Sequence, residues 1–199
     1  TVTVNPVTWT AGASTSNWAT PGNWNSSSVP NTIQDVVIPN ITPSPVIFSG
    51  AGGNCLGLTI NSGATLTINS GGSLITNGTI TNNGTITVLK AIEENSKWHL
   101  ISMPNENTTT TSFAGYYLQK WDEPTSNWDE ITETGVGMPA CKGYRLYDVP
   151  DITTFSFSGT PNTGNKSIAI TSNSSVEDTI GMNLIGNPYP SAIDWDVLN

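Results

Sequence analysis

The stretch Leu58-Thr59-Ile60-Asn61-Ser62-Gly63 recurs almost at once as Leu66-Thr67-Ile68-Asn69-Ser70-Gly71, and a weaker form of the pattern continues through Leu74, Ile80 and Ile86. All of its apolar residues have even numbers. Side chains on a β-strand alternate between two faces, so short strands that keep this parity across Asn and Gly corners send their Leu and Ile side chains to one shared interior. The repetition therefore predicts a right-handed parallel β-solenoid, in which short strands stack in successive coils.

An antiparallel meander is the competing interpretation of this segment, because Asn77-Gly78 and Asn83-Gly84 are strong signals for two-residue hairpin turns. A meander does not need repeated sequences, whereas stacked coils favour like residues above like residues. We therefore favour the solenoid and expect it over residues 1–90.

Three tryptophans, Trp9, Trp18 and Trp24, lie in the otherwise polar beginning of the chain. The open end of a solenoid exposes backbone edges and core side chains, and a cap prevents end-to-end pairing. We expect the three rings to form that cap. The alternative is that Trp18 and Trp24 belong to an aromatic platform for a sugar ligand.

Residues 91–199 contain more aromatic residues and most of the acidic ones. The turn sequence Pro124-Thr125-Ser126-Asn127 lies between two apolar runs and predicts a β-hairpin. Two related phrases that end at a proline, residues 97–104 and 181–188, are expected to be core strands leaving the sheet. Further strands are expected at residues 143–147, 154–157 and 167–170.

Short strands at this density predict an antiparallel β-sandwich or jelly-roll-like domain. The expected architecture is therefore all-β, with a capped parallel β-solenoid (β-helix) over residues 1–90 and a β-sandwich over residues 91–199. Because the chain starts at Thr1 without a leader and ends in mid-pattern at Asn199, we expect a piece of a longer polypeptide, with the sandwich truncated at its C-terminal end.

Composition argues against several classes of partner. The chain has 15 acidic and 6 basic residues, and its net charge of −9 disfavours nucleic acid and anionic membrane surfaces. No apolar run approaches the roughly 20 residues of a membrane-spanning helix. We expect neither a nucleic-acid partner nor membrane insertion.

Catalytic motifs are missing from the sequence. It contains no nucleophile elbow, phosphate loop or zinc-protease motif, and the single histidine, His99, has no nucleophile at a motif spacing. Arg145 is the only arginine available to bind the carboxylate of a uronate substrate. We expect no enzyme activity.

Paired carboxylates are the strongest argument for a glycosidase. Four acidic residues surround the predicted hairpin turn: Asp122, Glu123, Asp129 and Glu130. Acidic residues beside an exposed turn ordinarily stay solvated and protect a sheet edge from pairing, and we favour that interpretation.

The sequence gives weak support for a metal site and for a disulfide. Asp148 with Asp151, or Asp194 with Asp196, could supply oxygen ligands to one structural Ca²⁺, although the spacing of an EF-hand is missing. No other metal or cofactor is expected. A disulfide between Cys55 and Cys141 would link the two domains, but we favour small buried side chains for both.

Several motifs together carry a resemblance to a known class of proteins. They are Pro21-Gly22-Asn23-Trp24, Asp35-Val36-Val37-Ile38-Pro39, the Leu-Thr-Ile-Asn-Ser-Gly repeats and Gly186-Asn187-Pro188-Tyr189-Pro190-Ser191-Ala192-Ile193-Asp194-Trp195. Over nearly its whole length the chain resembles large secreted bacterial surface proteins exported by the type IX secretion system. The resemblance implies an extracellular, cell-surface location and carries over no catalytic residues. It also makes Asp178-Thr179-Ile180 a candidate O-glycosylation signal, for which an ordinary solvated turn is the favoured alternative.

The sequence thus predicts a non-enzymatic structural or adhesive module of the cell surface, with a glycan or a cell-surface protein as partner. One alternative is a carbohydrate-binding appendage of a polysaccharide-degrading enzyme, with Trp18, Trp24, Trp121 and Trp128 as ligand-binding residues. A second is a subunit of a self-assembling extracellular filament that pairs through the N-terminal strand, residues 1–4.

Overall fold

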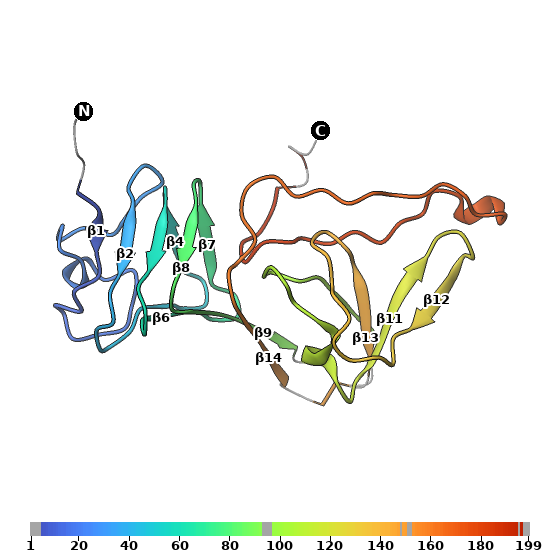
Figure 1. Ribbon diagram of the computed structural model, residues 1–199, viewed down its shortest axis with the longest axis horizontal. Coiled ribbons are helices and arrows are strands. Elements are labelled where there is room, and N and C mark those ends of the chain that lie inside the picture. The colour runs from blue at the N-terminus through green and yellow to red at the C-terminus, as the bar shows by residue number, and fades with distance from the viewer. Residues whose placement is uncertain (1–4, 93–96, 148, 151–152, 195, 197–199) are drawn as a thin grey trace. The chain divides into compact units, whose positions relative to one another are not determined.

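The computed structural model describes residues 5–92, 97–147, 149–150, 153–194 and 196, and these are mostly strands and loops (Figure 1). Helical structure in these residues is confined to the short 3-10 turns η1 (Pro21–Asn23), η2 (Thr110–Phe113) and η3 (Glu177–Thr179). The all-β class is therefore confirmed. The chain divides into a first unit of residues 1–90, 156–165 and 189–199 and a second unit of residues 91–155 and 166–188.

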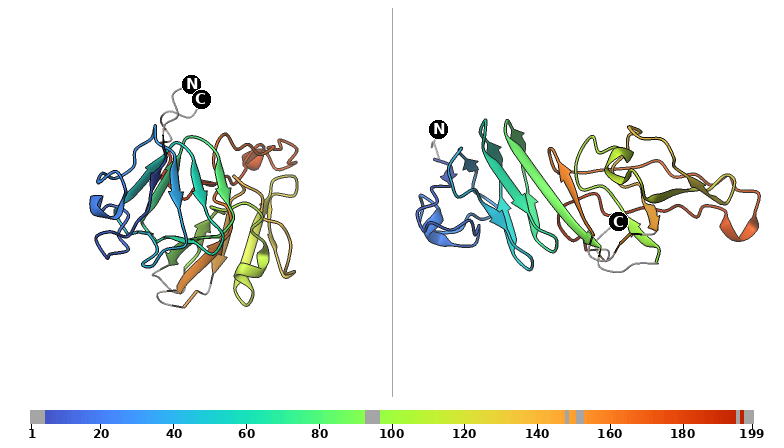
Figure 2. Two further views of the ribbon diagram at one scale, coloured as in Figure 1. Left: turned by 60° about the vertical axis from the view of Figure 1, so that its left-hand side comes forward. Right: turned by 90° about the horizontal axis from the view of Figure 1, so that it is seen from below.

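The first unit is made of short strands that pair in parallel. They are β1 (Val7–Thr8), β2 (Val36–Ile38), β3 (Val46–Ile47), β4 (Gly52–Cys55), β5 (Leu58–Ile60), β6 (Thr65–Ile68), β7 (Ser73–Thr76), β8 (Ile80–Asn82) and β9 (Thr85–Ile92). From β2 onwards, strands three places apart in the chain are neighbours, and β1 pairs with β2. This gives one column of β1, β2, β5 and β8, a second of β3, β6 and β9, and a third of β4 and β7 (Figure 2).

Parallel pairing excludes the meander. Asn77-Gly78 and Asn83-Gly84 lie at the corners between β7 and β8 and between β8 and β9, and each of these strands pairs with a strand of the preceding pass of the chain. Two glycines are required at such corners because their neighbours approach closely. A Cβ on Gly78 would lie 2.9 Å from the Leu56 carbonyl oxygen, and a Cβ on Gly84 would lie 2.3 Å from that of Ala64.

The interior of the first unit follows the predicted parity. Apolar residues at even positions are buried: Leu58, Ile60, Leu66, Ile68, Leu74, Ile86 and Val88. Thr59 and Thr67, on the opposite face, are half-buried. Ile80 is the exception and is also half-buried, since β8 is the last strand of its column and has a neighbour on one side only.

The three N-terminal tryptophans form one buried cluster beside β1. The Trp24 ring packs edge-on against Trp9 and Trp18, with centroid distances of 5.0 and 4.7 Å. Trp9 and Trp18 are fully buried and Trp24 is 2% exposed. A cluster at this end of the β1 column has the position expected of a cap. The burial of both rings argues against the alternative role of Trp18 and Trp24 as a sugar platform, because buried rings offer no face to a ligand.

Residues 156–165 and 189–199 group with the first unit. The Gly159 N–H donates to the Ile86 carbonyl at 2.9 Å, and the Tyr189 hydroxyl donates to the Gly164 carbonyl at 2.7 Å. The strand β14 (Thr153–Ser158) shares a sheet with β9. The N-terminal strand proposed for filament assembly, residues 1–4, lies outside the described residues.

The second unit contains one four-stranded antiparallel sheet. Its strands are β10 (His99–Ile101), β13 (Tyr144–Tyr147), β11 (Tyr117–Asp122) and β12 (Asn127–Glu130), in that spatial order. The hairpin prediction is confirmed by the pairing of β11 with β12, and the strands expected at 143–147 and 154–157 are confirmed as β13 and β14.

Two strand predictions in this unit, for residues 167–170 and 181–188, are wrong. Residues 167–170 form no strand, and beyond them the backbone of Thr171 bonds to the side-chain amide of Asn183. The phrase at 97–104 does contain β10, but its Leu100 is 70% exposed and Met103 is the buried residue. In the phrase at 181–188, Ile185 makes an isolated bridge to Lys142 and belongs to no strand.

Candidate ligand-binding surface

The sheet of the second unit has one apolar core face and one aromatic face. Residues directly opposite each other in an antiparallel pair lie on the same face. Leu118 pairs with Leu146, and both are buried. On the other face Tyr117 pairs with Tyr147, Gln119 with Arg145, and Trp121 with Trp128.

Side chains on this second face form a continuous row of contacts, which we call the aromatic stripe: Trp98, Tyr117, Trp121, Trp128, Arg145 and Tyr147. The Trp98 ring lies 5.6 Å from Tyr117 and 5.0 Å from Tyr147. The Trp121 and Trp128 rings lie 5.4 Å apart. Arg145 connects these two groups, because its Cζ atom lies 4.0 Å from the centroid of the Trp98 ring and 3.8 Å from that of Trp128.

The stripe is accessible to a ligand. Trp98 is 41% and Tyr117 is 39% exposed, and the neighbouring Leu100 is also largely exposed. The remaining members are half-buried. Half-exposed rings held in fixed positions are the usual elements of a binding surface, since they provide contact area without losing much side-chain freedom.

Polar groups within the stripe are arranged around Arg145. Its Nε–H donates to Gln119 Oε1 at 2.6 Å, and the Gln119 amide donates in turn to the Tyr117 hydroxyl at 3.0 Å. Desolvation lowers the pKa of Arg145, with Tyr117 acting in the opposite direction. A guanidinium group nevertheless keeps its charge at neutral pH.

An apolar cavity of about 520 Å³ lies at the hairpin end of the stripe. It is lined by Trp121, Trp128 and residues 181–184. The Trp121 Nε1–H donates to the Met182 carbonyl at 2.7 Å, which fixes this wall against the hairpin.

Glu123 anchors the segment that forms this wall. Glu123 is 2% exposed, and its carboxylate accepts hydrogen bonds from the backbone N–H groups of Asn173, Ser174 and Gly181 at 2.9 to 3.0 Å. Burial alone would raise the pKa of Glu123, but the bonds from Asn173, Gly181 and Ser174 outweigh burial and hold the pKa at about 2. Glu123 is thus an ionised structural group.

The candidate glycosylation residue is engaged in the same region. The Thr179 hydroxyl contacts the hydroxyls of Ser126 and Ser174 and donates to the Val176 carbonyl at 3.0 Å. These contacts favour the turn interpretation of Asp178-Thr179-Ile180, whose middle residue would have to leave its hydrogen bonds to be modified.

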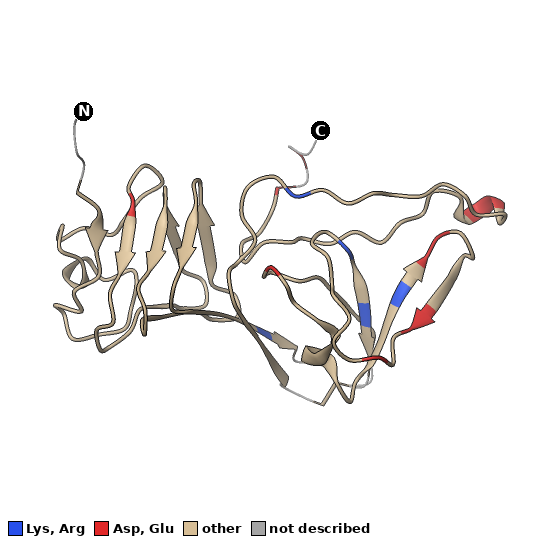
Figure 3. Cartoon of the chain, in the orientation of Figure 1, with Lys and Arg blue, Asp and Glu red and all other residues tan. Residues whose placement is uncertain are grey.

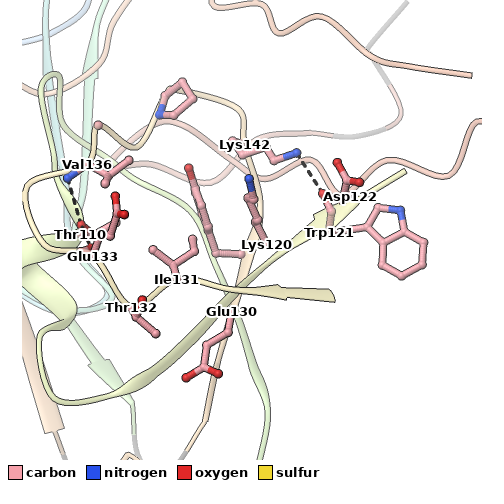
Figure 4. Close-up of a pocket in the computed structure, with 13 residues that line it drawn as sticks. Thr110, Lys120, Trp121, Asp122, Glu130, Ile131, Thr132, Glu133, Val136 and Lys142 are labelled. Atoms are coloured by element: carbon pink, nitrogen blue, oxygen red, sulfur yellow. Dashed lines mark hydrogen bonds between the residues drawn. The ribbon is translucent and has the colours of Figure 1, made fainter. Parts of the chain in front are cut away.

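A second cavity, of about 470 Å³, lies beside β11 and is shown in Figure 4. Its charged lining residues are Lys120, Asp122, Glu130, Glu133 and Lys142. In Figure 4 the Glu130 side chain points away from the two lysines, while the Lys142 Nζ atom donates to the Trp121 carbonyl at 3.3 Å.

Three of the four acidic residues near the hairpin each have a different partner in the structure. Asp122 accepts from the Thr125 hydroxyl at 2.6 Å, Asp129 lies 3.9 Å from Lys120, and Glu123 binds backbone amides. Charged residues gather around β11, β12, β13 and η3, whereas β1 to β8 carry few (Figure 3).

Among the described residues no group of three His, Cys, Asp or Glu side chains could hold a metal ion. Asp194 Oδ1 accepts from the backbone N–H of Asp196 at 3.0 Å, and the other two calcium candidates, Asp148 and Asp151, lie outside the described residues. Cys55 and Cys141 are both free thiols, and burial raises the pKa of Cys55 to about 11.

Of the four tryptophans predicted to bind a ligand, the structure brings two together at an accessible surface, Trp121 and Trp128. Sequence reasoning missed the other members of the stripe. A signal for them existed: aromatic or polar residues recur at every second position in 117–121 and again at Arg145 and Tyr147. They are opposite in phase to Leu118, Tyr144 and Leu146, which are buried on the other face of the same strands.

Comparison with known proteins adds one partial match. Residues 8–96 are similar to a family described as a domain of unknown function (DUF8693). The match covers the strands of the first unit and does not reach the stripe residues of the second. No curated protein and no solved structure matches the chain. No helix among the described residues is long and apolar enough to cross a membrane.

Proposed function

We propose that the chain is a non-enzymatic adhesive module, secreted to the cell surface, that binds a glycan through the aromatic stripe of its second unit. One observation carries this proposal: five aromatic side chains and Arg145 form an accessible row on one face of a sheet whose other face is the core. The resemblance to secreted surface proteins supports the location.

A glycan fits this surface because sugars present both apolar C–H faces and hydroxyl groups. The rings of Trp98, Tyr117 and Trp128 supply apolar contact area, and Gln119 and Arg145 add hydrogen-bonding groups between them. Binding surfaces that combine aromatic area with a few placed polar groups suit ligands of this mixed kind. The carbohydrate-binding role therefore moves from the N-terminal tryptophans to this face.

We further propose that the first unit is a capped, right-handed β-solenoid that serves as a rigid spacer. Parallel pairing in three columns, a shared apolar interior and a tryptophan cluster beside β1 support this fold. For the second unit we retain the β-sandwich as a proposal. Its support is the antiparallel sheet, together with the packing of Phe155 of β14 against Phe113 and Tyr116 at 5.1 and 5.2 Å.

The test is a glycan array probed with the native chain and with Trp128→Ala. We expect at least one class of polysaccharide to be bound, with affinity falling about tenfold or more in the variant because truncating a central aromatic side chain removes over 1 kcal/mol. Phe48→Ala is the matched control, since Phe48 is an exposed aromatic residue of the first unit. Unchanged binding by Trp128→Ala, or no binding to any glycan, would contradict the proposal.

A further inference from the structure

Arg145 has hydrogen-bonding capacity that the protein does not use. A guanidinium group carries five N–H donors, and the structure pairs the Nε–H with Gln119. Across the described residues, the Arg145 side chain makes no other hydrogen bond and no ion pair. It is half-buried, and none of its nitrogen atoms is among the fully buried atoms that lack a partner. Its terminal N–H groups therefore reach solvent within the stripe.

The position of this guanidinium group is fixed before any ligand arrives. The rings of Trp98 and Trp128 contact it at 4.0 and 3.8 Å, and Gln119 holds its Nε. Tyr117 fixes Gln119 in turn. An arginine restrained in this way loses little side-chain freedom on binding, which favours affinity.

A carboxylate is the group that suits such an arginine. The planar fork of terminal N–H groups matches the two oxygens of a carboxylate, and the resulting pair of hydrogen bonds is charge-assisted. A neutral sugar lying over the stripe would instead displace water from the guanidinium group without supplying a counter-charge, which is unfavourable.

We propose that Arg145 recognises the carboxylate of an acidic glycan, so that the ligand of the stripe is a uronate-containing polysaccharide. This inference rests on the proposed glycan-binding function and narrows its ligand class. Aromatic rings on both sides of Arg145 place contact surface for sugar rings next to the cation, and this favours a glycan over an acidic peptide.

The acidic character of the chain does not prevent this interaction. Of the acidic residues in the sheet, Glu130 is the one opposite Gln119 on the stripe face, and it makes no ion pair with Arg145 in the described part of the chain. At physiological salt the Debye length is about 8 Å, so the more distant acids are largely screened. A short-range contact at Arg145 can then outweigh the repulsion.

The experiment compares acidic oligosaccharides with neutral ones of the same backbone. Oligogalacturonates and oligomers of mannuronate and guluronate are titrated into the whole chain by calorimetry at physiological salt, each beside its carboxyl-reduced, neutral counterpart. We expect at least one acidic form to bind about tenfold or more tightly than its neutral counterpart, as a charge-assisted bidentate contact would provide.

Three variants separate recognition from net charge and from folding. Arg145→Gln should abolish the preference for the acidic form. Arg145→Lys should reduce it strongly, because an ammonium group lacks the planar fork. Lys120→Gln removes the same charge from the opposite face of the sheet and should keep the preference. Near-ultraviolet circular dichroism checks the tryptophan packing of each variant.

Equal affinity for acidic and neutral forms overturns the role of Arg145 and leaves glycan binding intact, whereas failure of every oligosaccharide to bind overturns both proposals. Equal losses in Arg145→Gln and Lys120→Gln would reduce the effect to net charge and overturn recognition. Tighter binding of poly-glutamate than of any uronate would also overturn the inference, since it would indicate an acidic protein partner.

Discussion

Replacing Leu66 by alanine tests the shared interior of the first unit. Leu66 is fully buried in β6, next to Ile86 of the following pass of the chain, which is also fully buried. Losing three buried carbon groups removes about 2.4 kcal/mol of transfer free energy at about 0.8 kcal/mol each. Neighbours held by backbone pairing on both sides collapse little, so a cavity term raises the expected loss of unfolding free energy to about 3–4 kcal/mol.

Differential scanning calorimetry of the whole chain is the assay, because it can resolve separate transitions of the two units. A loss of this size should lower the transition of the first unit by roughly 10–20 °C. Thr65→Ala is the matched control: Thr65 is exposed on the same strand, and its replacement should change the unfolding free energy by less than about 1 kcal/mol. If the two variants melt together, the burial argument from parity is refuted.

Two further predictions concern buried polar groups. In the tryptophan cluster the Trp24 Nε1–H donates to the Trp18 carbonyl at 2.9 Å. The Trp18 Nε1–H is buried and has no partner among the described residues. In urea unfolding, Trp24→Phe should therefore destabilise the first unit by about 1–2 kcal/mol more than Trp18→Phe does. In the second unit the pKa of Glu123 is lowered to about 2 from an ordinary 4.5, so the stability it contributes is complete above about pH 4.5 and is lost as the pH falls towards 2. Glu123→Gln should lower the melting temperature at pH 7 and flatten its pH dependence in that window, and a native melting temperature that is constant from pH 5 to pH 2.5 would contradict the assignment.

Most of the buried residues of the repeats could be predicted because the sequence pattern repeats. A repeated Leu-Thr-Ile sequence fixes which side chains point inwards, since the strand period is two and the corners preserve it. The same logic identified Leu58 and Leu66 as interior residues, and both are buried. It overestimated the burial of Ile80, because a periodic pattern does not show where a column of strands ends.

The tryptophans show where pattern reasoning reaches its limit. Trp18 and Trp128 both occur in polar surroundings in the sequence, yet one is fully buried and the other is half-exposed on the stripe. A large ring packs against an apolar surface that the tertiary structure leaves uncovered nearby. Local composition does not reveal that surface.

The composition of the stripe depends on strand order, which sequence does not supply. Trp98 precedes β10, Trp128 lies on β12 and Arg145 lies on β13, and these strands are distant in the chain. They come together because β13 is inserted between β10 and β11, which places Arg145 one strand from Trp98 and two from Trp128. Neighbouring strands lie about 4.8 Å apart. An arginine side chain on β13 is long enough to reach across β11 towards β12. If β13 had instead been added at the outer edge of β12, Arg145 would have contacted Trp128 alone. The insertion of β13 between β10 and β11 therefore brings separate aromatic residues into one surface with a cation at its centre. It also explains the role of Arg145, which did not support an enzyme when the sequence was considered alone but is the most specific group of the proposed binding site.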